Sequence, residues 1–105
     1  MNAAEAAAKT RVPVAARNAE RERVSATKRD DHINSARDLF GQSATSEVVE
    51  RHHAYMTGRV FEAVLLGVLT SADYEAATVA IQNAAAQAKR NIEGRLSIIR
   101  AGLAA

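Results

Sequence analysis

The amino-acid sequence predicts an all-α protein, in which a shorter charged helix and a flexible N-terminal arm precede a long antiparallel helical hairpin. Two apolar stripes with helical spacing, and the short break between them, lead to this prediction. The break at residues 70–73 is rich in helix-capping residues, and a connection this short makes the flanking helices antiparallel neighbours. The hairpin is therefore expected over residues 45–105, with helices at about 45–69 and 71–103.

The longer stripe predicts one helix that is too long for a small globule. Its members recur at spacings of three and four, between the period of a coiled coil and that of a straight helix. They are Tyr74, Ala77, Ile81, Ala85, Ala88, Ile92, Leu96, Ile99 and Leu103. Such a helix is roughly 45–50 Å long, whereas a compact domain of this size has a radius of gyration of about 13 Å. The helix therefore requires an equally long partner.

The second stripe predicts the partner helix, which begins at Thr45 or Ser46. It consists of Val49, His53, Met56, Val60, Val64 and Gly67. Residues 60–69 are apolar almost all round, which indicates burial on several sides. We expect Gly58 and Gly67 to permit close contact between helices, and Ser71 to cap the helix that follows.

The N-terminal part has weaker patterns. Residues 1–16 form an alanine-rich arm that contains Pro13 and has no stripe with which to dock, so we expect it to be mobile. Residues 17–41 predict a charged helix in which only the last two turns can pack, through Ile33, Ala36 and Phe40.

Composition excludes several classes of protein. The chain has 105 residues and no cysteine, so it is one domain without disulfides, thiolate metal sites or cysteine catalysis. Aromatic residues are only 4%, and an alanine-rich core buries little area, so association is expected to complete the core. The most apolar run, residues 60–69, is shorter than the roughly 20 residues that span a bilayer. We expect a cytoplasmic or virion-associated protein, and secretion without a cleavable signal stays open.

One pair of residues is of the kind that binds iron. Glu50 and His53 form Glu-x-x-His, which places a carboxylate and an imidazole on one helix face. The pair resembles that of ferritin-like di-iron proteins, and the resemblance implies a further glutamate from a neighbouring helix, for which Glu20 is the candidate. The alternative is that Glu50 is solvated and His53 is packed. We favour this alternative because so short a motif often matches by chance, and we expect no cofactor.

A cluster of basic residues suggests a second function, contact with nucleic-acid phosphates. Its members are Arg17, Arg21, Arg23, Lys28 and Arg29. Acidic residues are interleaved with them, and the cluster contains no aromatic residue for base stacking. Charge mixed in this way is more typical of a solvated helix face, on which oppositely charged side chains of the same helix pair with one another.

The favoured interpretation is a non-enzymatic helical adaptor or structural subunit that acts through oligomerisation or a helical partner, as in a phage or a secretion apparatus. No nucleophile elbow or glycine-rich phosphate loop is present in the sequence. The expected contact surface lies on the second helix and its end. It comprises Val49, His53, Met56, Val60, Phe61, Val64, Leu65 and Val68. A regulatory protein that binds nucleic acid is the first alternative, and a ferritin-like metal protein the second.

Overall fold

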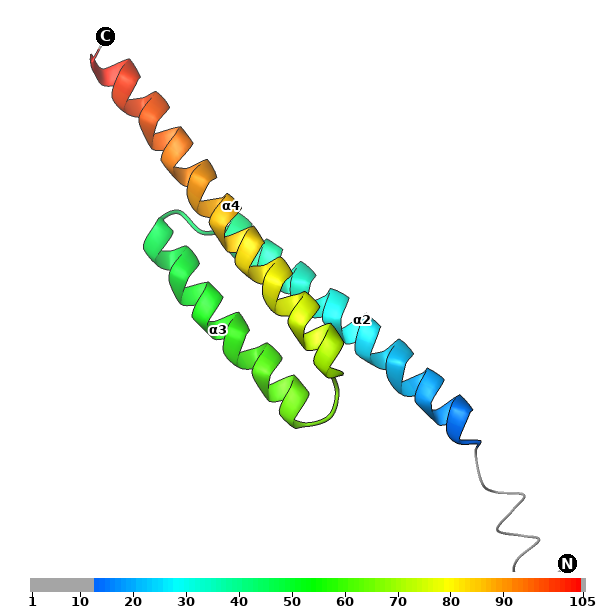
Figure 1. The fold of residues 1–105 in the computed structure, drawn as a ribbon. Helices are drawn as coiled ribbons and strands as arrows, with labels where there is room; N and C mark the ends of the chain where they lie inside the picture. Colours follow the sequence, from blue (N-terminus) through cyan, green and yellow to red (C-terminus); the bar gives the residue numbers. More distant parts are fainter. Residues whose placement is uncertain (1–12, 105) are drawn as a thin grey trace, which may run out of the picture.

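The structure, a computed structural model, describes residues 13–104 and is all-helical over that range. Three helices follow one another: α2 (Val14–Gly41), α3 (Ser46–Leu65) and α4 (Ser71–Ala104). They lie along one axis in a rod of 87 × 18 × 17 Å, with a radius of gyration of 21.4 Å (Figure 1). This is well above the value of about 13 Å for a compact domain of similar length.

Helices α3 and α4 are antiparallel neighbours, as the short connection predicts. Glu50, near the start of α3, pairs with Lys89 late in α4, at 2.9 Å between the charged atoms. Phe61, near the end of α3, packs edge-on against Tyr74 at the start of α4, with ring centroids 6.5 Å apart. Contacts therefore run in opposite directions along the two chains, which defines an antiparallel register.

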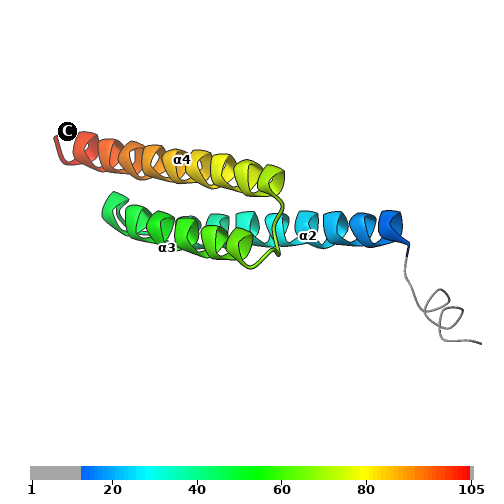
Figure 2. The ribbon, with the colours of Figure 1, turned by 60° about the horizontal axis from the view of Figure 1, so that its bottom comes forward.

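Helix α2 completes a three-helix bundle, because it packs against both other helices (Figures 1 and 2). It runs parallel to α4 and is shifted along it, so that each of these two helices projects beyond one end of the bundle (Figure 1). We call residues 25–92 the bundle. The N-terminal extension is residues 14–24 of α2, and the C-terminal extension is residues 93–104 of α4.

The core occupies the bundle alone. Its buried apolar residues come from all three helices and from Leu69 in the last connection. Small residues of α4 and larger residues of α3 contribute together, which allows the helix axes to approach closely. The members are Ala36, Phe40, Val49, Met56, Val60, Ala63, Leu69, Ala77, Ile81, Ala85 and Ile92.

The start of α2 differs from the expected boundary. The helix begins at Val14, directly after Pro13, rather than at residue 17. Proline has a helix-compatible φ, here −54°, and it disfavours helix for the residue before it, so a helix readily begins after it. Residues 14–16 are therefore helical, and the rest of the expected arm, residues 1–12, lies outside the described residues.

Helix α3 ends at Leu65, four residues before the expected position, and Gly67 is the reason. Gly67 has φ +74°, the left-handed conformation that favours glycine. The Val68 N–H donates to the Ala63 carbonyl at 2.9 Å and the Gly67 N–H to the Val64 carbonyl at 3.1 Å, which is the Schellman pattern of helix termination. The expectation that Gly58 and Gly67 permit close helix contact is wrong, since a Cβ at either position would meet no atom within 4 Å.

The caps of the other two helix starts are threonines. The Thr45 side chain accepts a hydrogen bond from the Val48 N–H at the start of α3, as expected. At the start of α4 the capping residue is Thr70 rather than Ser71. The Thr70 hydroxyl accepts from the Asp73 N–H at 3.2 Å, and Ser71 is already the first helical residue.

Candidate interaction site

The C-terminal extension carries an apolar stripe that nothing in the described chain covers. Ile92, the last core residue, is 4% exposed. The next members of the same stripe are Leu96 at 42%, Ile99 at 56% and Leu103 at 83%. Ile98, which lies outside this stripe, is 74% exposed. The extension therefore continues the core-facing side of α4 past the end of the bundle, into solvent (Figure 1).

Charged residues flank this stripe on both sides. Glu93 and Arg100 lie on one flank, seven residues apart, and Arg95 lies on the other. Glu93, Leu96, Ser97 and Arg100 line a shallow hollow of about 160 Å³. Their spacing of i, i+3, i+4 and i+7 is that of the four-residue hole which receives a side chain from a facing helix in a coiled coil.

A second exposed apolar patch lies at the end of α3. Phe61, Leu65 and Leu66 are 51%, 70% and 71% exposed. Phe61 leans on Tyr74 of α4, so this patch lies at the edge between the two helices. It is at the opposite end of the bundle from the C-terminal extension, because α3 and α4 are antiparallel.

The surface predicted from sequence divides between the core and solvent. Val49, Met56 and Val60 are at most 3% exposed within the single chain, and Val64 and Val68 pack against the core from its edge. His53 is half-buried, with its ring edge-on to Phe40 at 6.3 Å. Only two residues of the predicted set remain mostly exposed, Phe61 and Leu65. Helix α2 covers the apolar surface of α3 that the hairpin alone would leave open.

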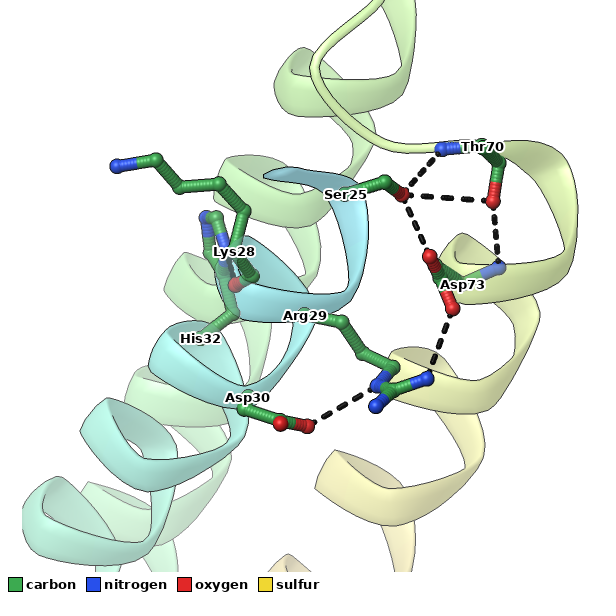
Figure 3. Close-up of polar contacts among 7 residues, drawn as sticks. All are labelled: Ser25, Lys28, Arg29, Asp30, His32, Thr70 and Asp73. Atoms are coloured by element: carbon green, nitrogen blue, oxygen red, sulfur yellow. Dashed lines mark hydrogen bonds and ion pairs between the residues drawn. The ribbon is translucent and has the colours of Figure 1, made fainter. Parts of the chain in front are cut away.

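A polar cluster joins α2 to the start of α4 (Figure 3). Ser25 is fully buried, and its hydroxyl accepts from the Thr70 N–H at 2.8 Å and lies 2.6 Å from Asp73 Oδ2, to which it donates. Arg29 Nη1 donates to Asp73 Oδ1 at 2.9 Å. The Ser25 hydroxyl thus bridges the Thr70 N–H and the Asp73 carboxylate, which would bond directly to each other in the second half of a capping box.

The electrostatics of this cluster favour an ionised aspartate. The hydrogen bond from Ser25 lowers the pKa of Asp73, and the hydrogen bond and charge of Arg29 lower it further, against the opposing effect of burial. The hydrogen bond to Asp30, and then that to Asp73, raise the pKa of Arg29. Sequence reasoning missed this contact. Hydrophobic spacing contains no signal for a buried serine, although the Thr-x-x-Asp pattern at 70–73 marks the cap itself.

The five basic residues predicted to contact nucleic acid divide between two parts of α2. Arg17, Arg21 and Arg23 lie on the N-terminal extension, where Arg23 pairs with Glu20. Arg29 is engaged with Asp30 and Asp73, and Lys28 lies beside a groove between α2 and α3. With Glu20 and Glu22 counted, the N-terminal extension has three positive and two negative charges, a net charge of +1. This small excess does not favour phosphate binding.

The structure does not bring the three candidate metal ligands together. Glu50 pairs with Lys89, Glu20 pairs with Arg23 on the N-terminal extension, and His53 packs on Phe40. Within residues 13–104, no group of three or more His, Cys, Asp or Glu side chains is placed to hold a metal ion.

A groove between α2 and α3 has a volume of about 460 Å³. Leu39 and Met56 contribute its apolar lining, and charged and polar side chains of both signs surround it. The mixture includes Lys28, Asp31, His32, Asp38 and Arg59.

No stretch of helix between residues 13 and 104 has the length and apolar character needed to cross a membrane. Comparison with known proteins adds no relative: no family model matches the chain, and neither a curated protein nor a solved structure is significantly similar to it.

Proposed function

We propose that this protein is a non-enzymatic helical adaptor or structural subunit, of the kind found in phage and secretion assemblies, which binds another helix through its C-terminal extension. The observation that carries this proposal is the change in exposure along one stripe of α4. Ile92 is 4% exposed, whereas Leu103, on the same stripe, is 83% exposed.

The energetics of the exposed stripe support a binding role. Full burial of a leucine or isoleucine side chain is worth about 1.5–3 kcal/mol. Three such side chains on one helix face, Leu96, Ile99 and Leu103, thus offer a partner several kcal/mol of gross burial energy. An extension of this length is also marginally stable as an isolated helix. A partner that covers the stripe therefore stabilises the helix and buries its apolar face at once.

The architecture presents the stripe as a stiff arm. Helix α4 has 34 residues, and its first two thirds are held in the bundle by α2 and α3. The extension continues the same helix, so its direction is set by the bundle and no flexible linker intervenes (Figure 1). This geometry suits a subunit that must hold a partner at a defined distance and angle.

Site-specific photo-crosslinking in cells of the native source tests the proposal. A benzoyl-phenylalanine at Leu103 should form one discrete adduct with a protein, whether a second copy or another chain. The matched control is the same residue at Val79, which is 55% exposed on the part of α4 within the bundle. The absence of an adduct at Leu103, or the same adducts at both positions, would contradict the proposal.

A further inference from the structure

The apolar stripe keeps a symmetric spacing as it leaves the bundle. From Ile92 its spacings are four, three and four, through Leu96 and Ile99 to Leu103. Ile92 is already buried in the bundle, so the residues available to a partner are Leu96, Ile99 and Leu103. A second copy laid antiparallel can place its Ile99 opposite Leu96 and its Leu96 opposite Ile99, so the centre of the contact needs no other sequence.

We propose that the C-terminal extensions of two copies pair antiparallel, with Leu96 of each copy opposite Ile99 of the other. This inference rests on the proposed function, because it assigns a second copy as the partner of the exposed stripe. It makes the interface isologous, so the two copies are related by a twofold axis that crosses the helices between residues 97 and 98.

Charge complementarity favours this pairing. In the proposed register Glu93 of one copy lies within two residues of the position opposite Arg100 of the other, on the same flank of the stripe. The twofold axis creates this contact twice. Within one chain the two residues are seven apart, about 10.5 Å along the helix, so they are not neighbours at the i, i+3 or i, i+4 spacing. Neither takes part in an ion pair within residues 13–104.

The N-terminal extension of a second copy is a poorer occupant. Its large apolar residues are only Val14 and Val24, and between them lie three arginines and two glutamates. Burying these charges against Leu96 and Ile99 would carry a desolvation cost without matched partners. The extension of α4 is therefore better matched by itself.

Sedimentation velocity over about 10–500 μM, a range that covers weak association, measures the pairing. The contact is smaller than the roughly 800 Å² per partner of a standard interface, so we expect a concentration-dependent dimer. Glu93→Arg and Arg100→Glu should each weaken it about five- to tenfold, because each turns two attractive pairs into repulsive ones. The double variant Glu93→Arg/Arg100→Glu should recover the wild-type constant. Glu22→Arg, the same charge change on the N-terminal extension, is the matched control and should have no effect.

Disulfide trapping measures the orientation, since the chain has no cysteine of its own. A mixture of Leu96→Cys and Ile99→Cys proteins should form the mixed disulfide in preference to either symmetric one. Predominance of the symmetric Leu96→Cys disulfide would show parallel pairing and overturn the proposal. Failure of the double charge variant to recover pairing, or a wild-type monomer at every concentration, would also overturn it. A photo-crosslinked adduct with a different protein would in that case leave the proposed function standing.

Discussion

The two parts of α4, within the bundle and beyond it, carry the same apolar stripe, which is buried in the first part and exposed in the second. From Ala77 to Ile92 its apolar residues are buried, apart from the half-buried Ala88, and from Leu96 to Leu103 they are exposed. The spacing does not change at residue 92, whereas the neighbours do, because α4 projects beyond both α2 and α3 at this end of the bundle (Figure 1). Burial in this protein is thus decided by the lengths and the stagger of the other helices, and the stripe alone does not reveal it.

The two extensions are alike in position and differ in their side chains. Both project from the bundle as helices, yet the N-terminal extension is dominated by charges and the C-terminal extension by an apolar stripe. A charged helix gains little from a partner, whereas an apolar face is a typical interaction surface. This contrast is the reason that we propose the C-terminal extension as the end that binds a partner.

The largest expected effect comes from the same isoleucine-to-alanine substitution made in each part of α4. Ile81→Ala, at a side chain 1% exposed in the bundle, should lower the free energy of unfolding by about 2–5 kcal/mol. Ile99→Ala, at a side chain 56% exposed, should change it by less than about 0.5 kcal/mol in dilute solution. Urea unfolding followed by circular dichroism, at a concentration below that of any dimer, measures both. Equal losses would show that the extension is already covered within one chain.

A second test removes the hydroxyl that joins α2 to the cap of α4. Ser25→Ala should lower the free energy of unfolding by about 1–3 kcal/mol, because it leaves the Thr70 N–H without its partner and Asp73 without its closest donor. Ser97→Ala on the exposed C-terminal extension is the control and should fall within about 0.5 kcal/mol of wild type. A loss at Ser25 no greater than that at Ser97 would contradict a role for the cluster in stability.

Glycine substitutions should have opposite signs in the two regions. Gly67→Ala should destabilise the bundle by about 1–2 kcal/mol, because alanine at φ +74° is strained. Gly94→Ala should stabilise the helix of the C-terminal extension by about 1 kcal/mol, since a Cβ there meets no atom within 4 Å. Thermal unfolding reports the first change, and amide hydrogen exchange of residues 93–104 reports the second. A higher melting temperature of Gly67→Ala, or a faster exchange in Gly94→Ala, would contradict these expectations.

The smallest expected effect is a pH dependence of the free energy of unfolding, which arises from Asp73 in the bundle. The pKa of Asp73 is lowered in the folded protein, so the folded state binds its proton more weakly than the unfolded state. The resulting stabilisation is present above the unfolded value of about 3.9 and is lost as pH falls through the lower folded value. Asp73→Asn should remove this part of the acid dependence, as measured by urea midpoints between about pH 5 and 2. An unchanged slope in the variant would show that other carboxylates cause it.

The sequence patterns predict the helices and the pairing of α3 with α4, but they do not predict how α2 packs on them. The two apolar stripes predict α3 and α4, and the break at residues 70–73 predicts their antiparallel pairing. The packing of α2 depends on Ser25 and Arg29, polar residues that hydrophobic spacing treats as solvated. For the same reason the expected contact surface included Val49, Met56 and Val60, which α2 and α4 cover in the structure.

The end of α3 could have been read from the sequence. Gly67 follows a helical stripe and precedes a new cap, which is the typical position of a glycine that terminates a helix. Its inclusion in the stripe as a small contact residue obscured that role. In contrast, the exposure of Leu96, Ile99 and Leu103 could not be predicted, because it depends on where α2 and α3 stop along α4.

The hydroxyl of Ser25 has an effect far from its own position. By bonding to Thr70 and Asp73 it determines which residue of α2 lies beside the first turn of α4. The 22 residues of α4 from Ser71 to Ile92 then place the end of the bundle about 33 Å from the cap, because a helix rises 1.5 Å per residue. A slip of one turn at the cap would change the free length at the far end by the same 5.4 Å. One serine therefore sets the reach of an arm that it never touches.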